Sequence, residues 1–414
     1  MINFFRTVLD NGLIVIIHED RSTPLVAMNI LYNVGSRDED PTMTGLAHLF
    51  EHLMYGGSAS IPDYDLPIQL AGGETNAFTN NDITNFYLTL PPENIETGFW
   101  LESDRMLGPE FSRRKLDIQK NVVMEEFRQR YLNQPYGDVM HKIRQLAYKI
   151  HPYRWPAIGM DILHVANIRL KDVKDFFYSH YAPNNAILTI TGNIDTERAH
   201  GLASKWFGTI PERTVKARSL PREPVQTEKR ILAVEKDVPS NALYKVWHSS
   251  ARKEKDFYTM DLLTDILAGG ESGRLHTRLV RKQNLFSEIN AYITSDIDPG
   301  LVVVHGRLMN GIGIKHAELA VDNVINELKT TPVSDIEMEK VKNKFESSNV
   351  ISNTNILNKA VKLAFHELLG DASEVNRESE YFRNVDKMMV RDAANKYFSR
   401  SNSSTLFYLS TRNK

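Results

Sequence analysis

Runs of apolar residues open both halves of this 414-residue chain and predict β-strands. In the first half they are residues 7–20 (TVLDNGLIVIIHED) and 24–35 (PLVAMNILYNVG), and in the second half residues 229–238 and 242–250. Residues 76–90 (NAFTNNDITNFYLTL) predict a hairpin, because two β-prone runs flank a polar turn. Each half is therefore expected to contain a sheet whose neighbouring strands are mainly antiparallel.

Amphipathic segments late in the chain predict helices, for example FHELLG (365–370) and AANKYF (393–398). Strands and helices mixed in this way are typical of α+β domains, in which helices pack on one face of an antiparallel or mixed sheet. The fold class expected from the pattern is therefore α+β, with the same architecture in both halves.

A repeated pattern indicates that the two halves are related. Asn76 in TNAFT and Asn290 in INAYIT are separated by an offset of 214, and Asn167 and Asn384 by an offset of 217. After Asn167 and after Asn384, a Val, an Asp and an aromatic residue follow at positions +6, +8 and +14. Two matches at nearly one offset predict two homologous domains of about 200 residues, a common size for a single domain.

The segment that separates the halves is residues 210–230 (IPERTVKARSLPREPVQTEKR), which is rich in proline and charge and poor in apolar residues. This composition is typical of an exposed linker. We therefore predict an N-terminal domain at 1–212, a linker at 213–228 and a C-terminal domain at 229–414.

The composition narrows the classes of function. Lys and Arg total 50 against 52 Asp and Glu, so the charge balance gives no reason to expect a nucleic acid or an anionic membrane as partner. Cysteine is absent, and any metal site must use nitrogen and oxygen ligands. No apolar run approaches the ~20 residues of a membrane span, and no secretion signal precedes the first strand. We expect a soluble cytoplasmic protein, or a periplasmic one if a signal has been removed.

The segment GLAHLFEHLMYGG (45–57) has polar residues where a buried helix would have leucine. His48 and His52 are four residues apart, so on a helix they share one face, and two imidazoles one turn apart can hold a divalent ion. Glu51 directly precedes His52 and would reach a metal-bound water without being a ligand. The same pattern also suits a helix with two hydrogen-bonded histidines and a surface glutamate.

A catalytic zinc site usually has a third protein ligand, and NVVMEEF (121–127) offers two adjacent carboxylates. On a helical wheel Glu126 falls within one arc and Glu125 points almost opposite. Lys120 and Arg130 also fall within this arc, whose apolar members are Leu116, Val122, Val123, Phe127 and Tyr131. Glu126 is the candidate ligand, and the alternative is a buried acid paired with Arg130 or another base.

These motifs together resemble the inverted-zincin peptidases, the pitrilysin, insulinase and mitochondrial-processing-peptidase family. HLFEH, TNAFTNNDITNFYLTL and NVVMEEF occur in the family's order, and the spacing from His52 to Glu126, which is 74, is close to the family's. The resemblance covers the whole chain, which is similar to short, half-length bacterial members. It implies one zinc ion per chain, held by His48, His52 and Glu126, with Glu51 as general base on a zinc-bound water. It also implies that a peptide docks on an edge strand through Asn76, Ala77, Phe78 and Thr79.

Two features depart from the family's pattern. Many relatives have a glutamate seven residues before the distal ligand, where this chain has Gln119, an amide that adds no charge near the site. In members whose C-terminal half completes the active site, an Arg is followed seven residues later by a Tyr, and residues 274–292 contain no such pair. The offset of 214 also puts Leu262, Asp265 and Ile266 at the positions of His48, Glu51 and His52, so the second domain is expected to lack a metal site. The loop HPYRWPAIG (151–159) resembles a family loop to which we assign no chemistry.

The resemblance implies a zinc metalloendopeptidase that hydrolyses peptides or unfolded polypeptide segments in a chamber formed by paired chains. The alternatives are a non-catalytic structural subunit of a larger complex that shares the fold, and a zinc-dependent binding module without turnover. A hetero-oligomer is favoured, in which a homologous chain of similar length supplies the Arg-x6-Tyr pair. A homodimer is the alternative, with side chains near Arg281 or Tyr292 in place of the pair.

Overall fold

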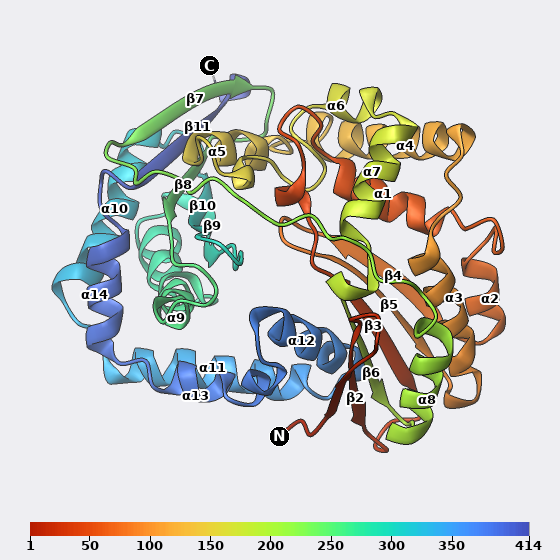
Figure 1. The fold of residues 1–414 in the computed structure, drawn as a ribbon. Helices are drawn as coiled ribbons and strands as arrows, with labels where there is room; N and C mark the ends of the chain where they lie inside the picture. Colours follow the sequence, from red (N-terminus) through yellow and green to blue (C-terminus); the bar gives the residue numbers. More distant parts are fainter. Residues whose placement is uncertain (414) are drawn as a thin grey trace. The chain divides into compact units, whose positions relative to one another are not determined.

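A computed structural model describes residues 1–413, which form two compact units, each discontinuous in sequence. The first unit comprises Met1–Arg128, Trp155–Leu220 and Val350–Arg377, and the second comprises Gln129–Arg154, Pro221–Asn349 and the chain from Glu378 onward. Each unit is built on one sheet covered by helices, as Figure 1 shows for each of them, so the expected α+β class with two related domains is confirmed.

The sheet of the first unit has six strands in the order β1-β2-β6-β3-β5-β4. β2 and β6 are parallel and all other neighbours are antiparallel, so the sheet is mixed. β4 lies at one edge, which is the property the docking prediction requires. The strands are β1 (Phe5–Val8), β2 (Ile14–Glu19), β3 (Val26–Tyr32), β4 (Glu74–Thr79), β5 (Thr84–Leu90) and β6 (Ala186–Gly192).

The sheet of the second unit has five strands in the order β7-β11-β8-β10-β9, with β7 and β11 parallel and the rest antiparallel. The five strands of this sheet have the same order and the same directions as five strands of the first sheet. β7 corresponds to β2, β11 to β6, β8 to β3, β10 to β5 and β9 to β4. The strands are β7 (Arg230–Lys236), β8 (Ala242–His248), β9 (Phe286–Ile293), β10 (Leu301–Leu308) and β11 (Ser403–Ser410). The repeat in the sequence therefore reflects a repeated topology.

The helices follow the same repeat. Leu170–His180 and Lys387–Tyr397 are related by the offset of 217 at both ends. Each precedes a strand of the parallel pair in its sheet, β6 in the first unit and β11 in the second. The helices of the first unit are α1 (Leu46–Tyr55), α2 (Asp65–Leu70), α3 (Ile95–Leu107), α4 (Arg113–Phe127), α6 (Ile162–Asn167), α7 (Leu170–His180), α8 (Thr196–Phe207) and α12 (Ile356–Leu369). Those of the second are α5 (Val139–Ala147), α9 (Asp256–Ala268), α10 (Ile314–Thr330), α13 (Glu378–Arg383) and α14 (Lys387–Tyr397), together with most of α11 (Asp335–Ser352).

Both faces of the first sheet are covered. Gly98 of α3 packs against Leu88 and Leu90 of β5, on the same face as Met28, the β3 partner of Leu88. Leu31 of β3 points to the opposite face, because side chains alternate along a strand. There it joins the apolar cluster that includes Leu363 and Ala364 of α12. In Figure 1, α3 and α8 lie on one side of these strands and α12 on the other.

The predicted boundaries at 1–212 and 229–414 do not account for two segments of the compact units. Residues 129–154 fall in the second unit, where α5 packs against the face of the sheet formed by Val246, Val303 and Leu406. Residues 350–377, which contain α12, fall in the first unit. The first residues of α5 and α12 are related by the same offset of 217. Each half of the sequence therefore contributes one helix to the sheet of the other half, because the remaining helices of each half cover only one apolar face of their own sheet. The predicted linker 213–228 contains no helix or strand and is mostly exposed.

Candidate metal centre and its surroundings

α1 has an apolar side and a polar side. Its apolar side chains are buried, and Phe50 stacks on Phe177 and packs at a tilt against Tyr181 of the first unit. The buried side chains are Leu46, Ala47, Leu49, Phe50, Leu53 and Met54. His48, Glu51 and His52 lie on the remaining arc and are only partly buried. The sequence spacing therefore produces one helix face with two imidazoles and a carboxyl group that solvent can reach.

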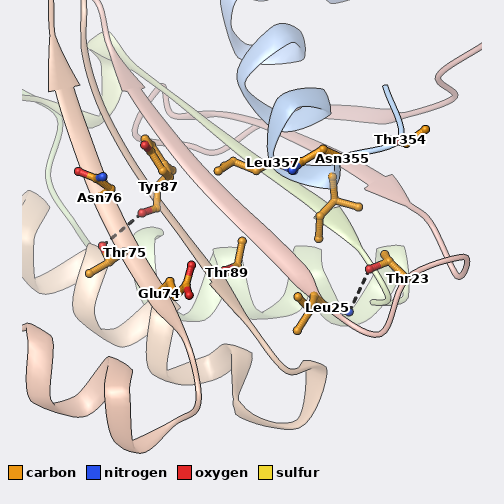
Figure 2. A pocket seen from close by; sticks show the side chains of 11 residues that line it. Thr23, Leu25, Glu74, Thr75, Asn76, Tyr87, Thr89, Thr354, Asn355 and Leu357 are labelled. Atoms are coloured by element: carbon orange, nitrogen blue, oxygen red, sulfur yellow. Dashed lines mark hydrogen bonds between the residues drawn. The ribbon is translucent and has the colours of Figure 1, made fainter. Parts of the chain in front are cut away.

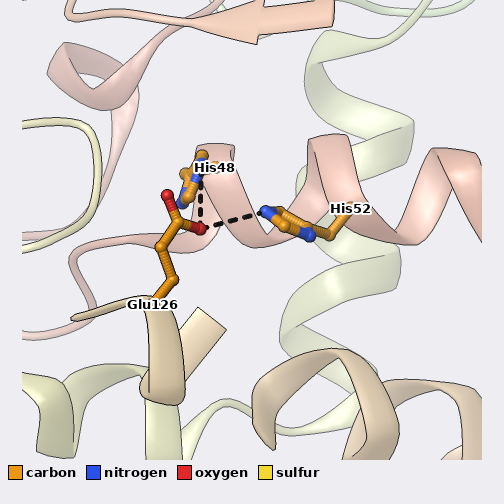
Figure 3. Close-up of side chains that lie close together, drawn as sticks. All are labelled: His48, His52 and Glu126. Carbon is orange, nitrogen blue, oxygen red and sulfur yellow. Dashed lines mark ion pairs between the residues drawn. The ribbon is translucent and has the colours of Figure 1, made fainter. Parts of the chain in front are cut away.

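The two histidines converge on Glu126 of α4, as Figure 3 shows. Nε2 of His48 and Nε2 of His52 lie 3.8 and 3.5 Å from Oε2 of Glu126. One ligand atom from each residue lies within 4.8 Å of the other two. Two imidazoles and one carboxylate are a usual donor set for catalytic zinc, with a fourth position open. The residues present therefore fit a zinc ion, and among residues 1–413 no second group of His, Asp or Glu meets the same criterion.

α4 presents Glu126 to the histidines while Glu125 points away. Glu125 forms an ion pair with Arg128 at 3.3 Å, and both of these side chains are about half exposed. Val123 and Phe127 are buried on the inner side, as the helical wheel predicts, but Val122 is 45% exposed. The prediction that Val122 faces inward is wrong, because Val122 lies at the edge of the predicted arc and stays exposed to solvent.

Glu51 is linked to the edge strand β4. Oγ1 of Thr79, the last residue of β4, donates a hydrogen bond of 2.5 Å to Oε2 of Glu51. Burial raises the pKa of the Glu51 carboxyl, while this hydrogen bond and the neighbouring His52 act in the opposite direction. The contact fixes the carboxylate beside the two histidines and next to a strand edge. Of the other β4 residues singled out, Asn76 is exposed, and Ala77 and Phe78 are half-buried.

Gln119 lies on α4, two turns before Glu126, and is half-buried. Its side-chain nitrogen is 3.8 Å from where a Cβ on Gly56 would lie. Gly56 follows the last residue of α1, so Gln119 packs against the C-terminal end of the helix that holds the histidines.

The N-terminus of α1 is held by a buried carboxyl group that the sequence reasoning missed. Glu39 is 6% exposed and accepts hydrogen bonds from the backbone N–H groups of Gly45 (3.0 Å) and Ala47 (2.8 Å). Nε1 of Trp155 also donates to it, at 3.0 Å. Burial raises the pKa of Glu39 to about 8. Three N–H donors and the helix N-terminus oppose that shift and favour the carboxylate.

Trp155 gives the loop HPYRWPAIG a structural role. Its indole is 1% exposed and also donates to the carbonyl of Ser36, and its own carbonyl accepts from the side chain of Asn81. The loop therefore fixes Glu39, which in turn fixes the first turn of α1. The signal in the sequence was a Trp between charged and Pro residues, which marks a packed loop without showing what it packs against.

We expect Glu39→Gln to lower the free energy of unfolding by about 1–3 kcal/mol, since the amide replaces one acceptor oxygen with a donor in a buried site that holds three N–H donors. Urea unfolding of this variant, of wild type and of Glu93→Gln, a change at an exposed glutamate of the same unit, measures the difference. An unfolding midpoint and slope equal to those of wild type would contradict this role for Glu39.

A buried cation supports the other end of α1. Arg105 of α3 is 2% exposed, donates to the carbonyl of Met54 at 3.2 Å and pairs with Glu102 at 3.1 Å. Its guanidinium lies over the rings of Tyr55 and Tyr64 at 4.7 and 4.8 Å. The carboxyl group at the N-terminus accepts from backbone N–H groups and the cation at the C-terminus donates to a backbone carbonyl, so α1 is fixed at both ends.

The second unit has no counterpart of the metal centre among the residues that the structure describes. Leu262 and Ile266 of α9, at the positions of the two histidines, are each 1% exposed and belong to the apolar core. Asp265, at the position of Glu51, forms an ion pair with Lys344 at 2.6 Å. The packing of α9 is therefore that of a core helix.

The arginines of residues 274–292 are paired within the second unit. Arg274 makes two hydrogen bonds, of 2.7 and 2.8 Å, to the carboxylate of Glu337. Arg278 pairs with Glu327, and the more exposed Arg281 lies 3.6 Å from Glu271. Arg274 thus has a structural partner on α11, and Arg278 has one on α10.

Comparison with protein families agrees with this arrangement. The model of the insulinase family (peptidase family M16) matches residues 14–159, which contain all three convergent side chains and Glu51. The model described as the peptidase M16 inactive domain matches residues 167–345, which contain Leu262 and Ile266. Every helix in residues 1–413 is too short or too polar to cross a membrane.

Individual relatives extend the likeness to nearly the whole chain. Zinc protease PqqE of Helicobacter pylori is 28% identical over 412 residues, which cover 96% of this chain and 91% of that protein. The crystal structure of a protease from Helicobacter pylori has a TM-score of 0.92 at 25% identity, covering 99% of this chain and 100% of the other. The periplasmic protease PqqL from Escherichia coli has the same fold, with a TM-score of 0.80 at 17% identity, and this chain spans 48% of it.

The expected resemblance is therefore confirmed. Two models of one family match consecutive parts of the sequence, and a relative described as a zinc protease aligns over 96% of this chain. This chain belongs to the insulinase family of peptidases, peptidase family M16.

Proposed function

We propose that the protein is a zinc-dependent endopeptidase that hydrolyses peptides or unfolded polypeptide segments. The observation that carries this proposal is the convergence of His48, His52 and Glu126 within 4.8 Å, with Glu51 on the same helix. The experiment that tests it compares zinc content and cleavage of a quenched peptide between wild type and Glu51→Gln, as argued below.

The three convergent side chains would hold one zinc ion per chain. When bound, zinc would activate water for attack and polarise the scissile carbonyl. Glu51 would take the proton from the attacking water and deliver it to the leaving amine, as a general base that then acts as an acid. The hydrogen bond from Thr79 holds one oxygen of the Glu51 carboxylate in place, and it leaves the second oxygen available to take the proton.

The substrate would bind along β4. β4 has β5 on one side, and within residues 1–413 no strand pairs with its other side. An extended peptide added there would bind through main-chain hydrogen bonds at Asn76, Ala77, Phe78 and Thr79, with weak demands on its own sequence. Because Thr79 also bonds to Glu51, a peptide on this edge would pass the candidate base.

A second candidate is a non-catalytic structural subunit of a larger complex. It is favoured by the description of the model that matches residues 167–345, an inactive domain, and by the apolar residues at the corresponding positions of α9. The zinc-dependent binding module without turnover is a third. Zinc content distinguishes the structural subunit from the endopeptidase. Turnover of a peptide distinguishes the endopeptidase from both the structural subunit and the binding module.

The chamber is proposed to need a second chain. This chain spans 48% of the Escherichia coli protease PqqL, so that protein has about twice the length of this chain. We favour a hetero-oligomer in which a homologous chain of similar length supplies the Arg-x6-Tyr pair, with a homodimer as the alternative. We propose a cytoplasmic location, and the description of PqqL as periplasmic makes a periplasmic location the alternative.

We expect co-expression with an Arg-x6-Tyr relative from the same genome to raise turnover of a quenched peptide by at least roughly 10-fold, the scale of a correctly positioned substrate-binding group. The control is the same relative with its Arg replaced by Ala, which should not raise turnover. Full activity of the isolated chain, unchanged by the relative, would reject the hetero-oligomer and leave the homodimer.

A further inference from the structure

A pocket of about 540 Å³ opens in the first unit beside β4 (Figure 2). Its walls come from β4 and β5, from Thr23 and Leu25 ahead of β3, and from the first turn of α12 with the residues before it. The side chains in Figure 2 are mostly hydroxyl, amide and carboxyl groups. A volume of this size is typical of ligand-binding sites.

Strand alternation places this pocket on the face of β4 opposite to Glu51. Thr79 donates to Glu51, whereas Phe78, one residue earlier, packs in the apolar cluster with α12. Glu74 shares the face of Phe78, because side chains of a strand alternate with a period of two. Its partner on β5, Thr89, also lines the pocket. A peptide added beside β4 would send alternate side chains to this same face.

Among the described residues that line the pocket, Glu74 is the only one with a charged side chain. It is exposed, and within residues 1–413 it has no ion pair or side-chain hydrogen bond. Lys359, one turn into α12, does not compensate its charge, since the Lys359 ammonium lies 2.5 Å from the Asp20 carboxylate. The pocket therefore has a net negative charge.

The helix end in the wall does not reverse this preference. The side chain of Asn355 accepts hydrogen bonds from the backbone N–H groups of Leu357 and Asn358, at 2.8 and 3.2 Å. These donors of the first turn of α12 already have an acceptor, so they do not form a site for an anion. The polar groups that remain favour a cation.

We propose that the pocket is a distal substrate subsite that takes a lysine or arginine side chain of the peptide docked on β4. This inference rests on the proposed docking of substrate on that strand. The aliphatic part of the side chain would lie against Leu25 and Leu357, and its charged end would reach Glu74 and the hydroxyl of Thr89. Thr79 is five residues from Glu74, or roughly 16 Å along a strand, which puts the preferred cation about four to six residues from the cleaved bond.

The test measures binding before turnover. Fluorescein-labelled peptides with one Arg, Gln or Glu at successive positions on either side of a fixed cleavage sequence are titrated into zinc-loaded Glu51→Gln protein, and anisotropy gives the affinity. At one position Arg is expected to bind roughly 3–5-fold more tightly than Gln, the scale of a solvent-accessible ion pair, and Glu more weakly than Gln. Adding Glu74→Gln should remove this preference, whereas adding the control Glu93→Gln should retain it.

Equal affinity for the Arg and Gln peptides at every position would overturn the proposal, as would a preference that persists in Glu74→Gln. The same peptides are then given to protein with Glu51 intact. Binding with a preference for Arg but without cleavage, both by this chain alone and with the co-expressed Arg-x6-Tyr relative, would reject the endopeptidase function and still support the subsite, so the two failures are distinguishable.

Discussion

Replacing Glu51 by Gln is expected to reduce turnover of a quenched peptide by at least about 100-fold, the usual scale for loss of a general base. The amide has nearly the same shape and can still accept the hydrogen bond from Thr79, so the local structure should remain. It cannot take a proton from water. Glu51 also lies outside the group of three convergent side chains, so zinc binding should not change.

The measurement is kcat and KM on the quenched peptide, together with zinc content of the same preparation. Glu93→Gln serves as the matched control, because it makes the same chemical change at an exposed position away from α1. Activity of Glu51→Gln within a few-fold of wild type would remove Glu51 from the role of base and favour the non-hydrolytic alternatives.

Glu126→Gln is expected to weaken zinc binding by more than about 100-fold, since even changes beyond the ligands of a metal site cost roughly 10–100-fold. Glu126 supplies the carboxylate that lies 3.5 and 3.8 Å from the two imidazole nitrogens. Glu125→Gln should have little effect, because that side chain is half exposed and paired with Arg128. The two variants make the same change at adjacent residues, so each controls for the other.

Competition with a chromophoric chelator gives the zinc affinity, and thermal unfolding of the metal-free variants checks that both fold. If Glu125→Gln lost the metal while Glu126→Gln kept it, the assignment of the third ligand would be incorrect. Equal affinity in both variants would exclude a role for either carboxylate.

The parts of the site that follow helical periodicity could be predicted from the sequence. His48 and His52 at a spacing of four, and Glu126 on the inner arc of its helix, are statements about one helix each, and the structure places these three side chains together. The position of Val122 shows the limit of that reasoning. A helical wheel gives directions around one helix, whereas exposure depends on which neighbours cover it.

Glu39, Trp155 and Arg105 could not be found this way, because each acts on α1 through contacts made by the tertiary fold. Glu39 and Trp155 are far apart in sequence and meet only beside the first turn of α1. A buried acid and a buried arginine resemble ordinary surface residues until their partners are known.

The exchange of α5 and α12 has a similar cause. The repeated pattern shows that the halves are homologous and gives the offset between them, but it does not show which sheet a helix covers. Residues such as Leu363 give α12 an apolar face that would suit either sheet. The contacts with β2, β3 and β6 assign it to the first unit, and the equivalent contacts assign α5 to the second.

We expect one zinc ion to be bound by two imidazoles of α1 and one carboxylate of α4. X-ray absorption at the zinc edge of wild-type protein with one equivalent of zinc measures this ligand set. The spectrum should show nearest neighbours of nitrogen and oxygen at about 2.0–2.2 Å, with the outer scattering of two imidazole rings. This pattern should fall to one ring in His52→Ala. A spectrum without imidazole scattering, or one unchanged in His52→Ala, would contradict the proposed centre.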